Sequence, residues 1–432
     1  MNQYTFSGTH RNVILGAIVL GVLCMILTWI GDDQYHTRFW SNFLHNSVFF
    51  TMVSAMALFF SAACITAYAG WHTTFKRVWE AYSMFLIVGM GLLLIVALGV
   101  YMHWHHLYHW ADEASVATDP VLKGKSSFLN KGWYTFGTLI FVGLWFFLAT
   151  RLRGLSLAED KDGDSSFSHH QTMRKYAAVA LPVIGFTSAA MIWQWVMSVD
   201  AHWYSTLFAW YTTASAFVSM IALTILLIIF LKSKGYYDQV NSNHLHDLGK
   251  YLFAISVFWT YLWFSQFMLI WYANIGEETI YFKERYNNYP VLFFLNLGIN
   301  FLVPFLILMR NDTKRKVGSL SFVAIVVLLG HWLDYFLMIK PGTLITRNHA
   351  MGHGHEAPAP DAGHGAAEAA GHAVEHVSSV VGGFSYPGLL EVGTFIGFLG
   401  LFLFVALTVL SRAALVPKND PYLQESLHHH VI

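Results

Sequence analysis

Polar side chains able to bind a quinone or carry a proton recur within the most apolar stretches of this chain. Many lie among aromatic residues, as in the run of residues 246–285. The ten candidates that we select are Gln194, Ser198, Asp200, His202, Ser265, Gln266, Glu277, Glu278, His331 and Asp334. Ionisable groups inside a membrane are costly and are functional as a default hypothesis. We therefore predict a quinone-binding or proton-carrying site, with no catalytic residue and no metal.

Spacing places two pairs of these residues on common helix faces, as a shared site would require. His331 and Asp334 stand three positions apart, which places them on a common face of a helix. An imidazole beside a carboxylate can exchange protons near neutral pH. Gln194 and Ser198 are one helical turn apart and also share a face. A quinol headgroup needs proton acceptors, aromatic walls and a slot open to lipid, and these segments supply all three kinds of group.

Each group also has a purely structural interpretation. Gln194 and Gln266 can bridge helices by hydrogen bonds, as amides do in membrane bundles. Asp200 and His202 can cap a tight turn. The Glu277 and Glu278 pair, beyond the end of its segment, can form a docking surface for a periplasmic partner. The aromatic residues nearby can serve as packing or interface-belt residues. These alternatives remain open at the level of the sequence.

The composition identifies the chain as a polytopic membrane protein. It has 432 residues, of which 56% are hydrophobic, 17% aromatic and 12% charged. The formal net charge of zero argues against a nucleic-acid partner. A spanning helix needs about 20 mainly apolar residues. Ten such runs are present, at about 11–30, 41–68, 78–101, 130–152, 175–198, 203–232, 246–273, 286–309, 318–339 and 389–410.

We therefore expect an all-α integral membrane protein with ten transmembrane helices. Nine of them fall in residues 1–339, and the tenth is 389–410, followed by a cytoplasmic tail at 411–432. Residues 340–388 hold an Ala, Gly, Pro and His-rich tract that cannot bury enough apolar surface to fold by itself. We interpret it as a flexible periplasmic loop. Its histidines lack the spacing of a zinc site, and we assign no role to His428, His429 and His430.

The distribution of Lys and Arg sets the orientation. Most of the 25 basic residues fall on one side if both termini are cytoplasmic, as the positive-inside rule requires. With no organelle signal and no cleavable leader, this predicts the inner membrane of a bacterium. Cys24 and Cys64 both fall inside spans, so we expect neither a disulfide framework nor a thiolate metal centre. A haem would need two facing histidines, and only His45 and His331 lie near the middle of spans.

Three motifs resemble one protein family. They are MSVDAHWYSTLFAWY, NHLHDLGKYLFAISVFWTYLWFSQFMLIWYANIGEET and GHWLDYFLMIKPGT. The chain is similar in these segments to the NrfD/PsrC-like membrane subunits of bacterial alternative complex III, a quinol:cytochrome c oxidoreductase. It looks most like the second, shorter quinone-binding-type subunit. The resemblance runs from the first helix to the tenth, without the His-rich tract.

The resemblance implies two four-helix bundles, helices 2–5 and 6–9, flanked by helices 1 and 10. It also implies partners: the related longer subunit, an iron–sulfur protein and haem c subunits, together with lipids and the quinone pool. Haem and iron–sulfur centres would then belong to partner subunits, with menaquinone as the expected quinone. Enzyme activity would belong to the assembly and not to this chain alone.

One position departs from the family pattern. Relatives commonly carry an acid before the Trp that precedes Met-Ser, whereas this chain has Gln194. An amide can bind a quinone but cannot take up its proton. The alternatives to a quinone site are therefore a proton-conducting subunit and a structural membrane anchor.

Overall fold

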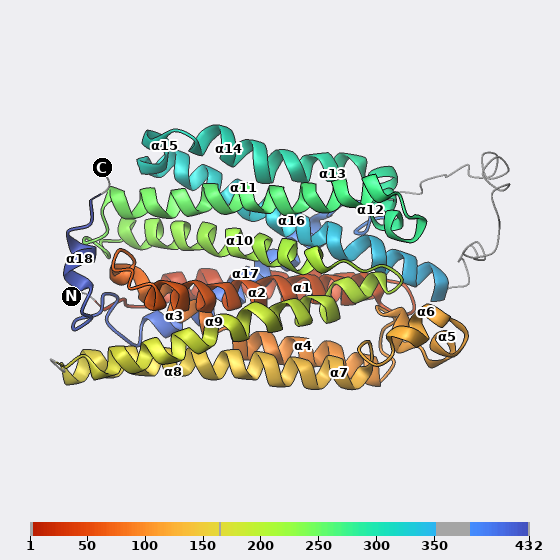
Figure 1. Ribbon diagram of the computed structural model, residues 1–432, viewed down its shortest axis with the longest axis horizontal. Coiled ribbons are helices and arrows are strands. Elements are labelled where there is room, and N and C mark those ends of the chain that lie inside the picture. Colours follow the sequence, from red (N-terminus) through yellow and green to blue (C-terminus); the bar gives the residue numbers. More distant parts are fainter. Residues whose placement is uncertain (1–2, 164–165, 351–380, 431–432) are drawn as a thin grey trace.

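Long helices that run side by side form nearly all of the molecule (Figure 1). The computed structural model describes residues 3–163, 166–350 and 381–430. Within those ranges there is no strand, only the isolated bridges of Gln3 with Ala414 and of Gly382 with Tyr386. Ten helical segments are long and apolar enough to cross a membrane. The all-α prediction and the count of ten are thereby confirmed, and the chain is a multi-pass membrane protein.

Seven of the spans are single helices. They are α1 (Gly8–Ile30), α2 (Thr37–Thr66), α9 (Ser168–Trp195), α10 (Thr206–Ser233), α11 (Ser242–Ala273), α16 (Val317–Ala350) and α17 (Leu389–Leu410). Both described chain ends lie at one end of the molecule, which we call the terminal end; we call the other the loop end (Figure 1).

The other three spans are composite. The third combines η1 (Thr73–Phe75), α3 (Lys76–Ser83) and α4 (Leu86–Tyr101). The fourth and eighth each contain a π-helical turn. The fourth is α7 (Lys131–Gly137), η3 (Thr138–Val142) and α8 (Gly143–Asp162), and the eighth is α13 (Pro290–Leu297), η5 (Gly298–Leu302) and α14 (Val303–Leu308).

Short helices connect the spans. Those at the loop end are η2 (His109–Ala111), α5 (Glu113–Thr118), α6 (Pro120–Lys125), η4 (Met197–Asp200) and α12 (Gly276–Asn288). Those at the terminal end are α15 (Asn311–Arg315) and α18 (Leu423–Leu427).

Contacts group eight spans into two sets of four. In the first set, α2 packs on α3, α4 and α9, while α8 packs on α4 and α9. In the second set, α10 packs on α11 and α16, while α14 packs on α11 and α16. Contacts of α2 with α10 and α16 join the two sets, and α17 covers α2 and α3 with α1 outside it. The π-helical turns η3 and η5 occupy the third span of each set.

The ninth span is longer than the sequence predicts. The sequence predicts an end near residue 339 and a loop from residue 340, but α16 continues to Ala350. Lys340 stays inside because its ammonium donates to Ser41 Oγ at 2.7 Å and is completely buried. Gly342 lies directly against Val199 and Asp200, where a side chain would not fit. The residues that follow, 351–380, hold most of the His-rich tract and lie outside the described residues.

Candidate functional site

A completely buried acid stands at the centre of the second set. Asp334 in α16 has no exposed surface, and three side chains from three other helices donate hydrogen bonds to it. Trp259 Nε1 of α11 lies 2.9 Å from Oδ2, and Asn296 Nδ2 of α13 lies 2.8 Å from Oδ1. The Tyr211 hydroxyl of α10 also donates to Oδ1. All four spans of the set thus meet at one carboxylate.

His331 accompanies Asp334 one turn away on α16, as the spacing predicts. Its Nδ1 lies 2.9 Å from Ser215 Oγ and 3.9 Å from Asp334 Oδ2. The second distance is too long for a hydrogen bond, but a closer approach of about 1 Å would make one. The edge of the Trp259 ring faces the imidazole, with ring centres 5.2 Å apart. His331 Nε2 is buried and has no hydrogen-bond partner among the described residues.

Polar groups extend from Asp334 along two helices. Asn300 Nδ2 donates to Asn296 Oδ1 at 2.6 Å, which continues the chain from the carboxylate into the π-helical turn η5. The hydroxyl of Ser215, at His331, stands one turn from Ser219, whose Oγ donates to the Ser215 carbonyl. Both branches lead towards the terminal end. We call Asp334, His331, Tyr211, Trp259, Asn296, Asn300 and Ser215 the Asp334 cluster.

The π-helical turn η5 contributes one member of this cluster. A π turn adds a residue to one helical turn and is often found at functional sites. Asn300 lies in this turn and Asn296 in α13 just before it, and both side chains are buried. Within the part of the chain that the structure describes, the Oδ1 atom of Asn300 has no hydrogen-bond partner. The cluster therefore contains two buried atoms, in Asn300 and His331, that are available for a further hydrogen bond.

The opposite face of α16 carries a second buried polar group. Arg38 of α2 forms a bidentate ion pair with Glu391 of α17, at 2.7 Å from Nε to Oε1 and 2.9 Å from Nη2 to Oε2. Asn42 donates to the same Glu391 Oε1 at 3.0 Å. His45 Nε2 meets the Trp332 carbonyl at 3.0 Å. Together with Lys340, these groups line the contact of α16 with α2 and α17.

The acids and histidines of the loop end make separate ion pairs. Asp200 in η4 pairs with Arg285 of α12 at 2.8 Å, and His202 pairs with Asp119 at 2.5 Å. Burial acts to lower the pKa of Arg285, but Tyr281 and Asp200 outweigh it, so the pKa is raised. Burial of Asp119 acts against its ionisation, but the His202 hydrogen bond and two backbone N–H groups hold its pKa below the ordinary value.

A small pocket connects three of the candidate residues. It has a volume of about 90 Å³ and is lined by Asp200, His202 and Glu277, with Glu284 and Arg285. Glu278 lies beside it, and its carbonyl accepts a hydrogen bond from Trp203 Nε1 at 3.0 Å. Ion-paired side chains thus line this pocket. This arrangement agrees with the structural interpretation of Asp200 and His202.

The remaining candidates lie in other places. Gln194 is fully buried and donates to the Phe128 carbonyl at 2.5 Å, and Ser198 Oγ donates to the Gln194 carbonyl. Gln266 is buried, with its Nε2 unpartnered by any described residue, while Ser265 is half-buried on α11. No hydrogen bond between described residues joins either amide side chain to the Asp334 cluster.

The structure does not bring all ten candidates together within the described residues. The structure pairs His331 with Asp334, groups Asp200, His202 and Glu277 at the loop end, and leaves the two amides apart. The reason is that depth along a helix follows from the sequence, whereas the face of a helix that meets a neighbour depends on packing. Residues at one height can therefore point into different contacts.

Sequence reasoning missed much of the Asp334 cluster. Tyr211, Trp259 and Ser215 look like ordinary residues of an aromatic span. Asn296 and Asn300 are easier to detect, because two amides at positions i and i+4 of an apolar run indicate a polar helix face. Lys340 and Arg38 fall just outside the predicted spans 318–339 and 41–68. No protein-family model matches the chain, and no match to it was found among curated proteins.

Proposed function

We propose that the chain is an integral membrane subunit of a respiratory quinol:cytochrome c oxidoreductase of the alternative complex III type, and that it carries protons through the Asp334 cluster. The observation that supports this most directly is a completely buried carboxylate with a histidine one turn away, inside four apolar helices. The redox assignment rests on the resemblance of the three motifs. In this proposal the loop end faces the periplasm of a bacterial inner membrane.

An acid is a poor choice for a purely structural contact at this position. Buried ion pairs and acids give little net stability compared with well-packed apolar residues. An amide has one acceptor oxygen, so it could not accept the hydrogen bonds that now reach both Oδ1 and Oδ2 of Asp334. The carboxylate also adds the ability to gain and lose a proton, and His331 is close enough to exchange one with it after a small movement.

The first set of helices offers a comparison within the same chain. Its fourth span, α9, ends in Gln194 and Trp195 in the region where α16 has Asp334 and Tyr335. Trp195 Nε1 donates to Thr138 Oγ1 of the π turn η3 at 2.9 Å. In the second set, Asn300 of the π turn η5 is likewise hydrogen-bonded to a member of the Asp334 cluster, Asn296. Since the amide of Gln194 cannot ionise, we assign proton transfer to the second set only.

Quinone binding is the second part of the proposal, and a groove between the two sets supports it. The groove has a volume of about 170 Å³ and lies between α2, α9, α10 and α11, lined by Met56, Phe59, Ser188 and Phe217 among others. Trp210 and Phe258 at its rim are exposed to the membrane. These walls suit the isoprenoid tail of menaquinone, while electrons would pass to the haem and iron–sulfur subunits.

The test is Asp334→Asn in the assembled complex. We expect quinol-driven cytochrome c reduction by the complex in liposomes to release fewer protons per electron, because an amide in place of this carboxylate cannot carry a proton. Asp312→Asn is the matched control, since Asp312 is an exposed acid outside the spans that pairs with Arg310 and Lys316. A menaquinol analogue that cross-links to groove residues would support the quinone part separately.

The possible outcomes separate the alternatives. Normal electron transfer with lost proton release assigns a proton-conducting role without redox work in this chain. Loss of both, with the complex still assembled, couples the cluster to quinol oxidation. If Asp334→Asn and His331→Gln together leave both measurements normal, the chain is a structural anchor and the proposal is wrong.

A further inference from the structure

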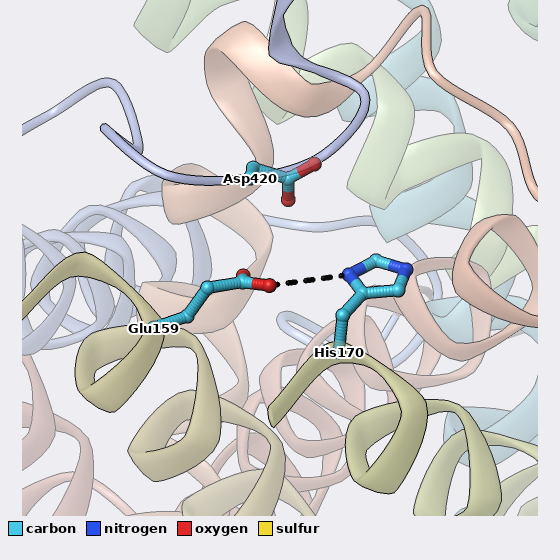
Figure 2. A group of neighbouring side chains, drawn as sticks. All are labelled: Glu159, His170 and Asp420. Atoms are coloured by element: carbon cyan, nitrogen blue, oxygen red, sulfur yellow. Dashed lines mark ion pairs between the residues drawn. The ribbon is translucent and has the colours of Figure 1, made fainter. Parts of the chain in front are cut away.

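A second buried group of ligating side chains lies at the terminal end, far from the Asp334 cluster. Glu159 of α8, His170 of α9 and Asp420 of the C-terminal segment converge there, with their polar atoms turned towards one another (Figure 2). One oxygen or nitrogen atom from each lies within 4.8 Å of the others, and all three residues are buried. The sequence predicts no metal site because about 250 residues separate Asp420 from the other two.

The polar atoms of this group are poorly satisfied by the described part of the protein. Glu159 is 3% exposed and His170 is 6% exposed. Among the described residues, neither carboxylate oxygen of Glu159 and neither ring nitrogen of His170 has a hydrogen-bond partner, and His170 Nδ1 lies 3.6 Å from Glu159 Oε1. Buried polar atoms in folded proteins are almost always paired. The Asp420 oxygens accept from Lys76 and from the Tyr422 backbone N–H, so these four atoms belong to Glu159 and His170 alone, and they point to a further ligand beside those two side chains.

The surrounding charges favour a cation as that ligand. A network of ion pairs joins four carboxylates to three basic side chains. Its members are Glu80, Glu159, Asp160, Asp420, Lys76, Arg77 and Arg153. With His170 neutral, the network has one negative charge in excess. Carboxylate oxygens together with an imidazole are a ligand set typical of divalent transition metals.

We propose that Glu159, His170 and Asp420 bind a divalent metal ion of the Zn²⁺ type, which fastens the C-terminal segment to α8 and α9. The site is independent of the Asp334 cluster and of any redox role. Asp420 anchors the segment 411–430, which crosses the terminal end of the molecule (Figure 1). A metal here would be structural, because it would tie the C-terminal segment to α8 and α9, which follow one another in the chain but are distant from Asp420 in sequence.

Lys76 competes with the metal for the same oxygens. Its ammonium forms a close ion pair with Asp420 and lies 4.0 Å from Glu159 Oε2. Two cations cannot share these oxygens without strong repulsion. Binding of the metal therefore moves Lys76 away from Asp420. A metal ion binds the His170 side chain through a ring nitrogen that carries no proton.

The experiment measures Zn²⁺ binding to the purified full chain in detergent. The histidines of residues 349–376 are replaced by Gln throughout, so that the His-rich tract does not contribute bound metal. We expect one tightly bound Zn²⁺ per chain in this background. His170→Gln and Glu159→Gln should each weaken binding at least about tenfold. Lys76→Met should strengthen it, since the competing cation is removed.

Neighbouring residues provide matched controls. His169 and Asp162 adjoin the site in the sequence but form an exposed pair of their own at 2.9 Å. We expect His169→Gln and Asp162→Asn to leave Zn²⁺ affinity unchanged. Failure to find a bound ion in the background protein, or equal losses in His170→Gln and His169→Gln, would overturn the proposal. Weaker binding in Lys76→Met would do so as well, and a folding defect cannot imitate the expected gain.

Discussion

At the scale of single residues, Arg285 shows how a proline is accommodated inside a span. Pro341 in α16 has no N–H group, so the Leu337 carbonyl one turn earlier loses its helical partner. Arg285 Nε donates to that carbonyl at 3.0 Å, and its Nη2 donates to the Met338 carbonyl at 3.2 Å and to Asp200 at 2.8 Å. One buried guanidinium thus compensates for the proline and also neutralises an acid.

We predict that Arg285→Met lowers the free energy of unfolding by about 3 kcal/mol, because it leaves the half-buried Asp200 and the Leu337 carbonyl unpaired. In a Pro341→Ala background the helix can bond the Leu337 carbonyl itself. The loss should then be smaller by about 1 kcal/mol. Chemical unfolding of all four proteins measures this coupling. Equal losses in both backgrounds would show that Arg285 acts through Asp200 alone.

At the scale of helices, α1 and α17 approach each other as closely as backbones can. Gly21 and Gly397 face each other, and a methyl group on either would clash with the Cα of the other. Small residues at such crossings permit close packing between helices in membranes. Gly16 lies on the same helix α1 but has open space around it. Gly16 and Gly21 therefore have different roles in α1.

We predict opposite effects for the same substitution at these two positions. Gly21→Ala should destabilise the protein by about 2 kcal/mol, because the helices must separate. Gly16→Ala should be neutral or stabilising by up to about 1 kcal/mol, since alanine favours the helix and meets nothing. Thermal unfolding in detergent compares them. If Gly21→Ala and Gly16→Ala destabilised the protein equally, the loss would come from contacts with lipid or detergent and not from the crossing of α1 with α17.

At the scale of the whole molecule, the C-terminal segment joins the two sets of helices. Asp420 pairs with Lys76, and Ser426 Oγ donates to the Trp71 carbonyl at 2.9 Å, both beside the first set. His429 Nε2 lies 2.7 Å from Asp247 of α11 in the second set. The segment therefore closes the terminal end by side-chain contacts with both halves.

Acid should release this segment only at low pH. Burial acts to raise the pKa of Asp420, but the Lys76 ammonium outweighs it and holds the pKa below the ordinary value of 3.8. A lowered pKa means that the contact is fully formed above pH 3.8 and is lost as pH falls through the folded value. We expect protease cleavage within 411–430 to stay slow from about pH 7 to about pH 5.

The control for this prediction is Asp420→Asn, which should make cleavage faster at neutral pH and remove the dependence on acid. Measurement needs a protease that is active over the whole range, with the cleavage site identified by mass spectrometry. Release of the segment in wild-type protein between about pH 6 and about pH 7 would contradict the prediction. Such release would show that the contact does not depend on the Asp420 carboxylate.

The sequence by itself determined the ten spans, the all-helical class and the pairing of His331 with Asp334, because hydrophobic length and helical spacing are local properties. It could not determine that Asn296, Tyr211 and Trp259 converge on Asp334, nor that Glu159, His170 and Asp420 meet. Those contacts depend on how each helix is rotated against its neighbours. Rotation is set by side-chain packing over the whole bundle, so only the tertiary structure decided which polar groups share a site.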